Sequence, residues 1–340
     1  MMDLRYATRI TAVQPLWTIE GGRVTVLGEH FPMEPGPPGV TIGGAGAHVA
    51  FASSRSLTAT MPAGLEGGRT PIRVEGAEGE TAFIEVGVPL ATGLHQVDNP
   101  AFDPSGNLYV TFSGSRGQQP PVSVYKVGAD GARVPFVSDL SNATSLAFDR
   151  HGRLHVSSRF DGSVHRVDAN GHSEVVATDL GVACGIAFGR NDELYVGDRS
   201  GSVLRVVGER AEILASLPPS VAAFHLAFGP DDHLYVSAPT ISSSDSVYRV
   251  SPSGDVTRIG PSFGRPQGLA FDADGRLYVV DALAGNSGLF RIDLTRPAEA
   301  EPLLLGGALI GLAFAPAGGL VVAAAETVYR FDVPLRGLTR

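Results

Sequence analysis

Side chains that could do chemistry recur at one position of a repeated motif in this chain. The motif is the dipeptide Ala-Phe, which ends a short apolar run six times, roughly every 40 residues, between residues 101 and 314. The residues four places before each phenylalanine are Asp98, Thr144, Cys184, Phe224, Gln267 and Ile310. Repeats that stack in a ring place equivalent residues around one axis, so we expect this set to face a common channel.

The next position along the motif carries a histidine that could act as a general base. The six residues there are Asn99, Ser145, Gly185, His225, Gly268 and Gly311. Glycine lets neighbouring backbones approach closely, whereas the three polar residues place functional groups near the channel. A histidine titrates near neutral pH, so His225 and the carboxylate Asp98 are the catalytic candidates. The alternative is that His225 is hydrogen-bonded to a neighbouring loop and has no role in chemistry.

Arginines add a possible site for an anion on the same side of the repeats. Arg116, Arg159 and Arg199 lie in equivalent loops of three consecutive repeats, between the second and third predicted strands. Arginine donates paired hydrogen bonds to a carboxylate or phosphate, so these loops could form half of a binding rim. The alternative is that they join neighbouring repeats. The corresponding loops at residues 112–121 and 239–246 are the longest, and together they could cover a small pocket.

The remaining candidates complete a predicted substrate-binding set. Cys184 is either a nucleophile or a small buried apolar residue, since no base for it is evident in the sequence. The predicted substrate-binding residues are Asn99, Thr144, Ser145, Cys184, Phe224, Gln267, Arg116, Arg159 and Arg199.

Each repeat predicts four short strands, and these strands must position the candidate residues. In the fifth repeat the Ala-Phe strand is followed by a turn, then by strands at Leu277–Val279 and Leu289–Ile292. Four short strands in about 40 residues are typical of a β-propeller blade. The sequence therefore predicts a six-bladed β-propeller over residues 88–340. The last repeat lacks a fourth strand, and residues 88–93 resemble the fourth strands elsewhere, so we expect them to close the sixth blade.

The run Gly268–Val279 resembles NHL repeats and the senescence-marker-protein/gluconolactonase family of propellers. It reads Gly-Leu-Ala-Phe-Asp-Ala-Asp-Gly-Arg-Leu-Tyr-Val. The resemblance implies a hydrolase or lyase acting on a small anionic or lactone-like molecule, or a non-catalytic scaffold that binds a ligand or protein. It also implies calcium or zinc held by acidic and amide side chains at the Asp98 position. Here only Asp98, Thr144 and Gln267 offer oxygen, so the metal-dependent chemistry is either absent or moved.

Residues 1–87 lack the repeat and predict a separate all-β unit. The segments Ile10–Pro15, Gly21–Gly28 and Leu57–Pro62 resemble IPT/TIG immunoglobulin-like domains. The resemblance implies a β-sandwich that serves as a spacer or docks a protein partner.

Composition narrows the classes of function. The 340 residues include 43 glycines and 24 prolines, which favours turns between strands over long helices. A net charge of −9 argues against nucleic acid as a partner. The single cysteine allows no internal disulfide, and no apolar run suits a signal peptide or a membrane span. We therefore expect a cytoplasmic protein with a small-molecule ligand.

Overall fold

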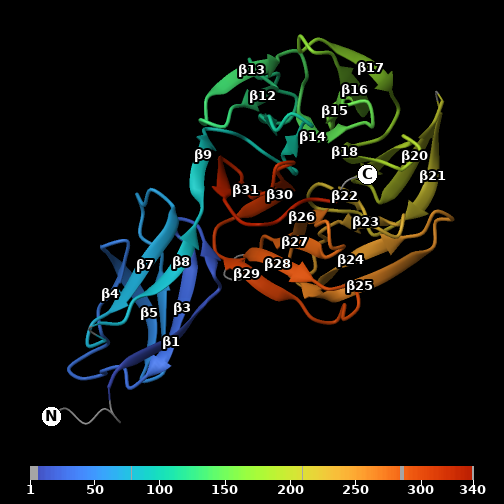
Figure 1. The fold of residues 1–340 in the computed structure, drawn as a ribbon. Helices are drawn as coiled ribbons and strands as arrows, with labels where there is room; N and C mark the ends of the chain where they lie inside the picture. The colour runs from blue at the N-terminus through green and yellow to red at the C-terminus, as the bar shows by residue number, and fades with distance from the viewer. Residues whose placement is uncertain (1–6, 78, 209, 284–286, 339–340) are drawn as a thin grey trace.

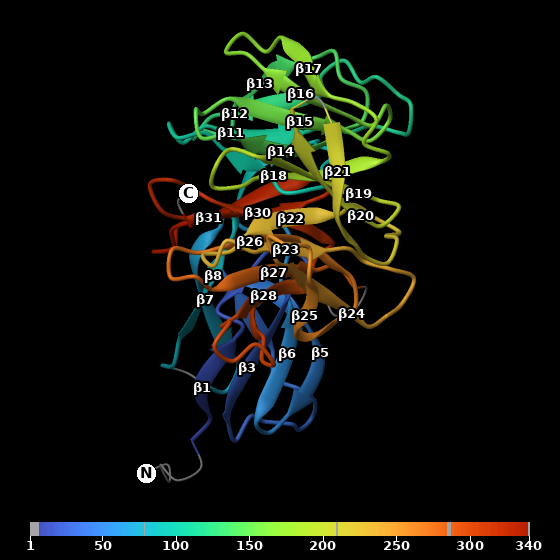
Figure 2. The ribbon, with the colours of Figure 1, turned by 90° about the vertical axis from the view of Figure 1, so that its right-hand side faces the viewer.

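Strands make up all the regular structure of this computed structural model, which describes residues 7–77, 79–208, 210–283 and 287–338. Figure 1 shows small sheets arranged in a ring about a common centre, with an elongated sandwich attached at one side. In the view turned by 90° the sandwich lies below the ring (Figure 2). The predicted all-β class with a sandwich before a propeller is confirmed. No helix among the described residues is long and apolar enough to cross a bilayer.

The sandwich is built from eight strands that alternate buried apolar and outward-facing residues. They are β1 (Arg9–Gln14), β2 (Trp17–Thr18), β3 (Arg23–Glu29), β4 (Val40–Ile42), β5 (Ala45–Ser53), β6 (Ser56–Thr60), β7 (Gly68–Val74) and β8 (Ala82–Val86). In β3 the fully buried Val24 and Val26 alternate with partly exposed neighbours. Such alternation packs one face of each strand on the core, where Ile42, Leu57 and Ile72 are also fully buried.

Five of the repeats form separate four-stranded antiparallel sheets. Their strands are β10 (Ala101–Phe102), β11 (Leu108–Thr111), β12 (Val124–Val127), β13 (Arg133–Val137); β14 (Ala143–Phe148), β15 (Leu154–Ser158), β16 (Ser163–Val167), β17 (Ser173–Ala177); β18 (Ala183–Phe188), β19 (Leu194–Asp198), β20 (Ser202–Val207), β21 (Arg210–Ser216); β22 (His225–Phe228), β23 (Leu234–Ser237), β24 (Asp245–Val250), β25 (Val256–Phe263); and β30 (Leu309–Phe314), β31 (Leu320–Ala324), β32 (Thr327–Phe331), β9 (Val88–Thr92). The first strands of neighbouring repeats contact one another around the channel (Figure 1).

The fifth repeat departs from the predicted set of separate blades. Its strands β26 (Pro266–Phe271), β27 (Leu277–Asp281), β28 (Gly288–Ile292) and β29 (Glu301–Leu305) belong to a twelve-stranded sheet shared with the sandwich. The link is β2, which pairs in parallel with β8 on one side and with β29 on the other. The outer strand of a blade exposes unpaired backbone groups, and here β2 of the sandwich pairs with those of β29. Trp17 and Ile19 beside this link pack into the propeller core, with Trp17 5.9 Å from the Phe331 ring.

The ring closes through a strand from the start of the propeller. β9, which follows the sandwich directly, pairs antiparallel with β32 near the end of the chain. Residues 88–92 thus supply the fourth strand that the last repeat lacks. Because the first and last segments of the ring share one sheet, the ring has no open seam.

Aromatic side chains pack one repeat against the next. In five of the six Ala-Phe motifs the phenylalanine meets, edge to face, an aromatic ring on the second strand of the preceding repeat. The pairs are Tyr109–Phe148, His155–Phe188, Tyr195–Phe228, Tyr235–Phe271 and Tyr278–Phe314, with centroids 4.7 to 5.4 Å apart. Such contacts add to the burial of the rings, so the motif found in the sequence holds the ring together.

Candidate functional site at the channel mouth

The histidine singled out in the sequence lies at the centre of a buried polar chain. His225 at the start of β22 places Nδ1 2.5 Å from Asp98 Oδ1, and its Nε2 lies 2.9 Å from Gln267 Oε1. The imidazole is completely buried, and the other two side chains are at most 5 % exposed. Three of the predicted residues, from the first, fourth and fifth repeats, are therefore brought together in the channel.

Both nitrogens of His225 face oxygen atoms. An imidazolium satisfies this arrangement by donating to the Asp98 carboxylate and to the Gln267 carbonyl oxygen. A neutral ring satisfies it when it donates to Asp98 and accepts from a Gln267 amide turned by 180°. In either state both nitrogens have partners inside the protein. The alternative expectation for His225 was a hydrogen bond to a neighbouring loop. His225 is indeed hydrogen-bonded within the protein, and its partners are the side chains of Asp98 and Gln267.

Asn99 fills the channel beside this chain. Its Nδ2 donates to Leu269 O and its Oδ1 accepts from Leu312 N, both at 3.0 Å. A Cβ at Gly268 would lie 2.1 Å from Asn99 Oδ1, and one at Gly311 would lie 2.6 Å from it. The glycines are needed because the asparagine and neighbouring backbone atoms occupy the space that a side chain would take. Asn99, a predicted substrate-binding residue, instead joins strands of the fifth and sixth repeats.

Three other predicted substrate-binding residues also make contacts within the protein. Thr144 Oγ1 donates to Asn142 O at 2.8 Å, and Ser145 Oγ accepts from Ile186 N at 3.1 Å. Phe224 is fully buried in an apolar cluster. None of these three lines the pocket described next.

A pocket of about 370 Å³ opens above the buried chain, at the channel mouth. Its charged lining consists of Arg159, Arg199 and Arg265, and no Asp or Glu is among the described residues that line it. No ion pair joins these guanidinium groups to any residue that the structure describes. Cys184 and Gln267 form part of the lining, so these two predicted residues do reach the pocket. The pocket is therefore strongly basic in a chain that is acidic overall.

Arg265 was not among the predicted residues, because it lies two places before Gln267 and nearer the mouth than the predicted ring. Residues i and i−2 of a strand share one face, so the ring above Asp98 and Gln267 lies six places before each phenylalanine. Four residues at that position line the pocket: Gln96, Ala222, Arg265 and Ala308. Repeat spacing groups these four residues, whereas the tertiary structure shows that they line the mouth.

Burial and like charges together act on Arg159. Burial lowers the pKa of its guanidinium; nearby Cys184 opposes this, and Arg199 and Arg116 lower the pKa further. Arg116 itself is exposed and does not line the pocket. The charges of three predicted arginines are therefore concentrated on one side of the mouth, with Arg265 from the fifth repeat completing the pocket lining.

Arg199 also joins neighbouring repeats. Its Nε donates to Ser220 O at 3.1 Å and its Nη2 to Val221 O at 2.9 Å. These bonds hold the segment that precedes β22 against the third repeat. For Arg199 both interpretations of the arginine loops therefore apply, since the same guanidinium joins two repeats and lines the pocket.

The thiol of Cys184 is poorly suited to act as a nucleophile. The side chain is 2 % exposed, and burial raises its pKa to about 11. A thiol with that pKa is protonated at neutral pH, whereas the nucleophile in cysteine chemistry is the thiolate. The structure thus favours the interpretation of Cys184 as a small buried residue that borders the pocket.

A family model matches the N-terminal part of the chain, and solved structures resemble the fold of most of it. The model of the IPT/TIG domain matches residues 8–84. The N-terminal sandwich is a TIG domain. No curated protein matches the chain.

Solved structures resemble the fold over most or nearly all of the chain. A gluconolactonase from Xanthomonas campestris has a TM-score of 0.61 at 17 % identity, over 91 % of this chain and 98 % of that one. A putative gluconolactonase has a TM-score of 0.59 at 17 % identity, over 74 % and 93 %. An auxiliary nutrient binding protein from Bacteroides thetaiotaomicron has a TM-score of 0.56 at 14 % identity, over 96 % and 98 %. At these identities the likeness establishes a shared fold.

The oxygen donors at the expected metal position do not fit a calcium or zinc ion. The carboxylate of Asp98 contacts His225, and the hydroxyl of Thr144 donates to Asn142 O. Gln267 directs its oxygen at His225. Hard cations need several free oxygen ligands, and these donors already have partners. Among the described residues, no three His, Cys, Asp or Glu side chains gather closely enough to hold a metal.

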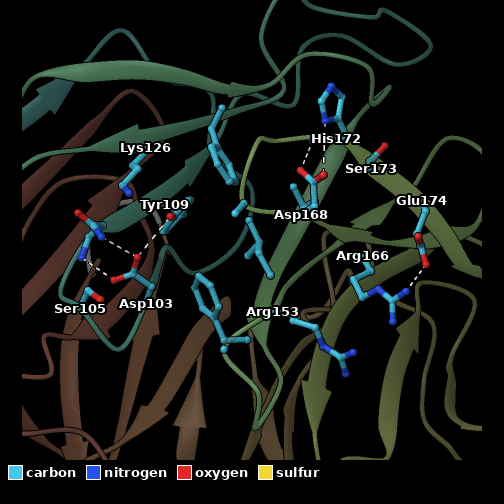
Figure 3. Close-up of a pocket in the computed structure, with 17 residues that line it drawn as sticks. Asp103, Ser105, Tyr109, Lys126, Arg153, Arg166, Asp168, His172, Ser173 and Glu174 are labelled. Carbon is cyan, nitrogen blue, oxygen red and sulfur yellow. Dashed lines mark hydrogen bonds and ion pairs between the residues drawn. The ribbon is translucent and has the colours of Figure 1, made fainter.

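A larger hollow of about 820 Å³ lies at the other end of the ring, between the first and second propeller repeats (Figure 3). Its ionic side chains are matched: Lys126, Arg153 and Arg166 face Asp103, Asp168 and Glu174. Arg166 pairs with Glu174, and His172 Nδ1 lies 3.4 Å from Asp168 Oδ2 (Figure 3). Because these charges balance, the hollow lacks the unmatched positive charge of the mouth.

Proposed function

We propose that the propeller binds a small anionic molecule, a carboxylate or phosphate, at the channel mouth. The observation that carries the proposal is the gathering of Arg159, Arg199 and Arg265 around one pocket whose described lining contains no acidic side chain. Arg159 is half-buried beside the exposed Arg199 and Arg265, and a bound anion would relieve the repulsion between their charges. Guanidinium groups also match carboxylate and phosphate oxygens in geometry.

Binding is favoured over catalysis by the state of the reactive groups. His225 is fully buried with both nitrogens partnered, and the Cys184 thiol has a pKa raised by burial. Gln267 is the member of the polar chain that lines the pocket. We therefore assign Gln267 to ligand contact and the Asp98–His225 pair to holding its amide in place.

Calorimetric titration of the full chain with succinate and with inorganic phosphate at low ionic strength tests the proposal. We expect binding that weakens as salt is raised, because the attraction is electrostatic. Replacing Arg159 or Arg265 by glutamine should weaken binding of these anions by about 10-fold to 100-fold, the range for a hydrogen bond to a charged group. The matched control is Arg296→Gln, which removes the same charge from an exposed turn remote from the mouth. Equal affinity in the Arg159→Gln and Arg296→Gln variants would reject the site.

A second candidate function is hydrolysis or elimination on a small lactone-like molecule. The observation that favours it is the 2.5 Å contact between Asp98 and His225 beneath the pocket, since a carboxylate-bonded histidine is a common acid–base arrangement. Proton release from glucono-1,5-lactone, followed with and without a chelator, tests it. Catalysis requires turnover that survives the chelator and is lost in His225→Gln; a rate equal to that of buffer alone rejects this function.

A further inference from the structure

We propose that the anion bound at the mouth is amphipathic, a carboxylate with an aliphatic tail of several carbons, and that the tail lies in the adjoining hollow of the fourth propeller repeat. The inference rests on the proposed function, because the arginine pocket holds the head group. The hollow measures about 520 Å³ and is formed by the segment before β22 and the loop between β23 and β24. Val221 lines both this hollow and the arginine pocket, so the two lie side by side.

The apolar side chains of the hollow suit an aliphatic tail, and serine, threonine and Arg258 side chains complete the lining. Its apolar lining is supplied by Pro218, Pro219, Val221, Ile241 and Tyr248. The one acid in the lining, Asp245, is 6 % exposed and accepts hydrogen bonds from Thr240 N at 2.9 Å and Thr240 Oγ1 at 2.8 Å. The Arg258 guanidinium lies over the Tyr248 ring, with its Cζ 5.9 Å from the ring centroid.

Ile241 is held in water next to this hollow by a well-bonded loop. Its exposed fraction is 95 %, the highest among the large apolar side chains of the described residues. The loop is not a loose tip, because Thr240 is bound to Asp245 and Ser244 Oγ lies 2.6 Å from Ser262 Oγ. Ser242 N also donates to Thr240 Oγ1 at 3.0 Å. Covering this large apolar side chain with an aliphatic tail would remove it from water and so lower the free energy of the complex.

Arg199 defines where the head group ends and the tail begins. Its guanidinium donates to Ser220 O and Val221 O, the residues that form the wall between the two hollows. A carboxylate near Arg159 and Arg199 therefore has Val221 beside it, and a chain attached to that carboxylate reaches Pro219 and Ile241 by crossing Val221. The charged and apolar surfaces follow one another in the order that an amphipathic anion requires.

Calorimetric titration with acetate, butyrate, hexanoate and octanoate, all below micelle-forming concentrations, tests the inference. Each added methylene that enters the hollow should strengthen binding about threefold to fourfold. Ile241→Ser should reduce the affinity for octanoate at least fivefold and leave that for acetate unchanged. The matched control is Ile213→Ser, at a side chain that is 67 % exposed on β21, and it should leave every affinity unchanged. Because Ile241 and Ile213 are both exposed, neither variant should disturb the fold.

The outcomes separate this inference from the proposed function. Affinities that depend on Arg159 but not on chain length would overturn the tail and leave the anion site standing. Affinities that rise with chain length but are the same in Ile241→Ser and Ile213→Ser would overturn the placement of the tail. Failure of all four carboxylates, succinate and phosphate to bind would overturn both.

Discussion

Asp98 and His225 are 127 positions apart in the sequence, and the carboxylate of one lies 2.5 Å from the imidazole of the other inside the channel. The first belongs to the segment entering the first propeller repeat and the second to the fourth, so the contact spans the ring. Because both side chains are buried, neither can be satisfied by bulk water. The hydrogen bond between Asp98 and His225 therefore contributes to the stability of the ring as well as to the polar chain beneath the pocket.

Removing one member of this pair should destabilise the protein strongly. His225→Leu leaves the buried Asp98 without its partner, and we expect the free energy of unfolding to fall by about 3–5 kcal/mol. Urea denaturation followed by circular dichroism measures it. The double variant Asp98→Leu/His225→Leu should lose less than the sum of the two single variants, since it leaves no unpaired charge. Strictly additive losses would show that the contact does not couple the two residues.

Cys184 should make the protein less stable in alkali. Its pKa is about 11 in the fold against a model value of 9.0, so above pH 9 the unfolded chain loses the proton first. The stabilisation from this group is complete below pH 9 and decreases by about 1.4 kcal/mol per pH unit as the pH rises towards 11. Denaturation midpoints from pH 8 to 11 should fall less steeply in Cys184→Ala. The comparison isolates the thiol from Tyr109, Tyr235 and Tyr278, whose pKa values burial raises to about 12.

Gly268 should tolerate no side chain. A Cβ there would lie 2.5 Å from Gly311 Cα and 2.8 Å from Ile310 O, as well as against Asn99. We expect Gly268→Ala to lower the free energy of unfolding by about 3 kcal/mol or more, because backbone atoms cannot move aside. Removing the asparagine side chain with Asn99→Ala should not restore stability. Gly46→Ala, where no atom lies within 4 Å of the added carbon, is the control and should remain near the parent value.

The link at β2 should make the TIG domain and the propeller unfold together. Ile19 is 2 % exposed and packs in the propeller core, although it belongs to the TIG segment. Ile19→Ala should lower the free energy of unfolding by about 2–5 kcal/mol and weaken the contact between the two domains. Trp17, the single tryptophan, lies at this junction, so its fluorescence reports it directly. We expect fluorescence and circular dichroism to give coincident transitions in the parent protein and separate ones in the variant.

Much of the architecture was predictable because it depends on local patterns. The Ala-Phe motif, its turn and the strand that follows recur with regular spacing, and the structure shows why: each motif phenylalanine packs on the preceding repeat. The role of Val88–Thr92 followed from a missing strand at the other end of the chain. The TIG resemblance rested on alternating residues over nearly the whole segment, and residues 8–84 match that domain.

The site was predictable only in part. Repeat spacing identified Asp98, His225 and Gln267 as residues of one channel, and it located Arg159 and Arg199 at its mouth. It did not show that His225 would use both nitrogens inside the protein, because that depends on which repeats face each other across the ring. It also did not show that Ser145 and Asn99 would bond to backbone groups, since their partners lie in separate sheets.

The sequence by itself determined the repeat, its strands and the ring they form, because strand alternation and turn residues act over a few positions. Tertiary structure alone decided how deep each side chain lies in the channel. That depth places Arg265 with Arg159 and Arg199 at the mouth and puts His225 out of reach of solvent. It also decided that β2 joins β29, because a free strand edge is filled by whichever segment packing brings beside it.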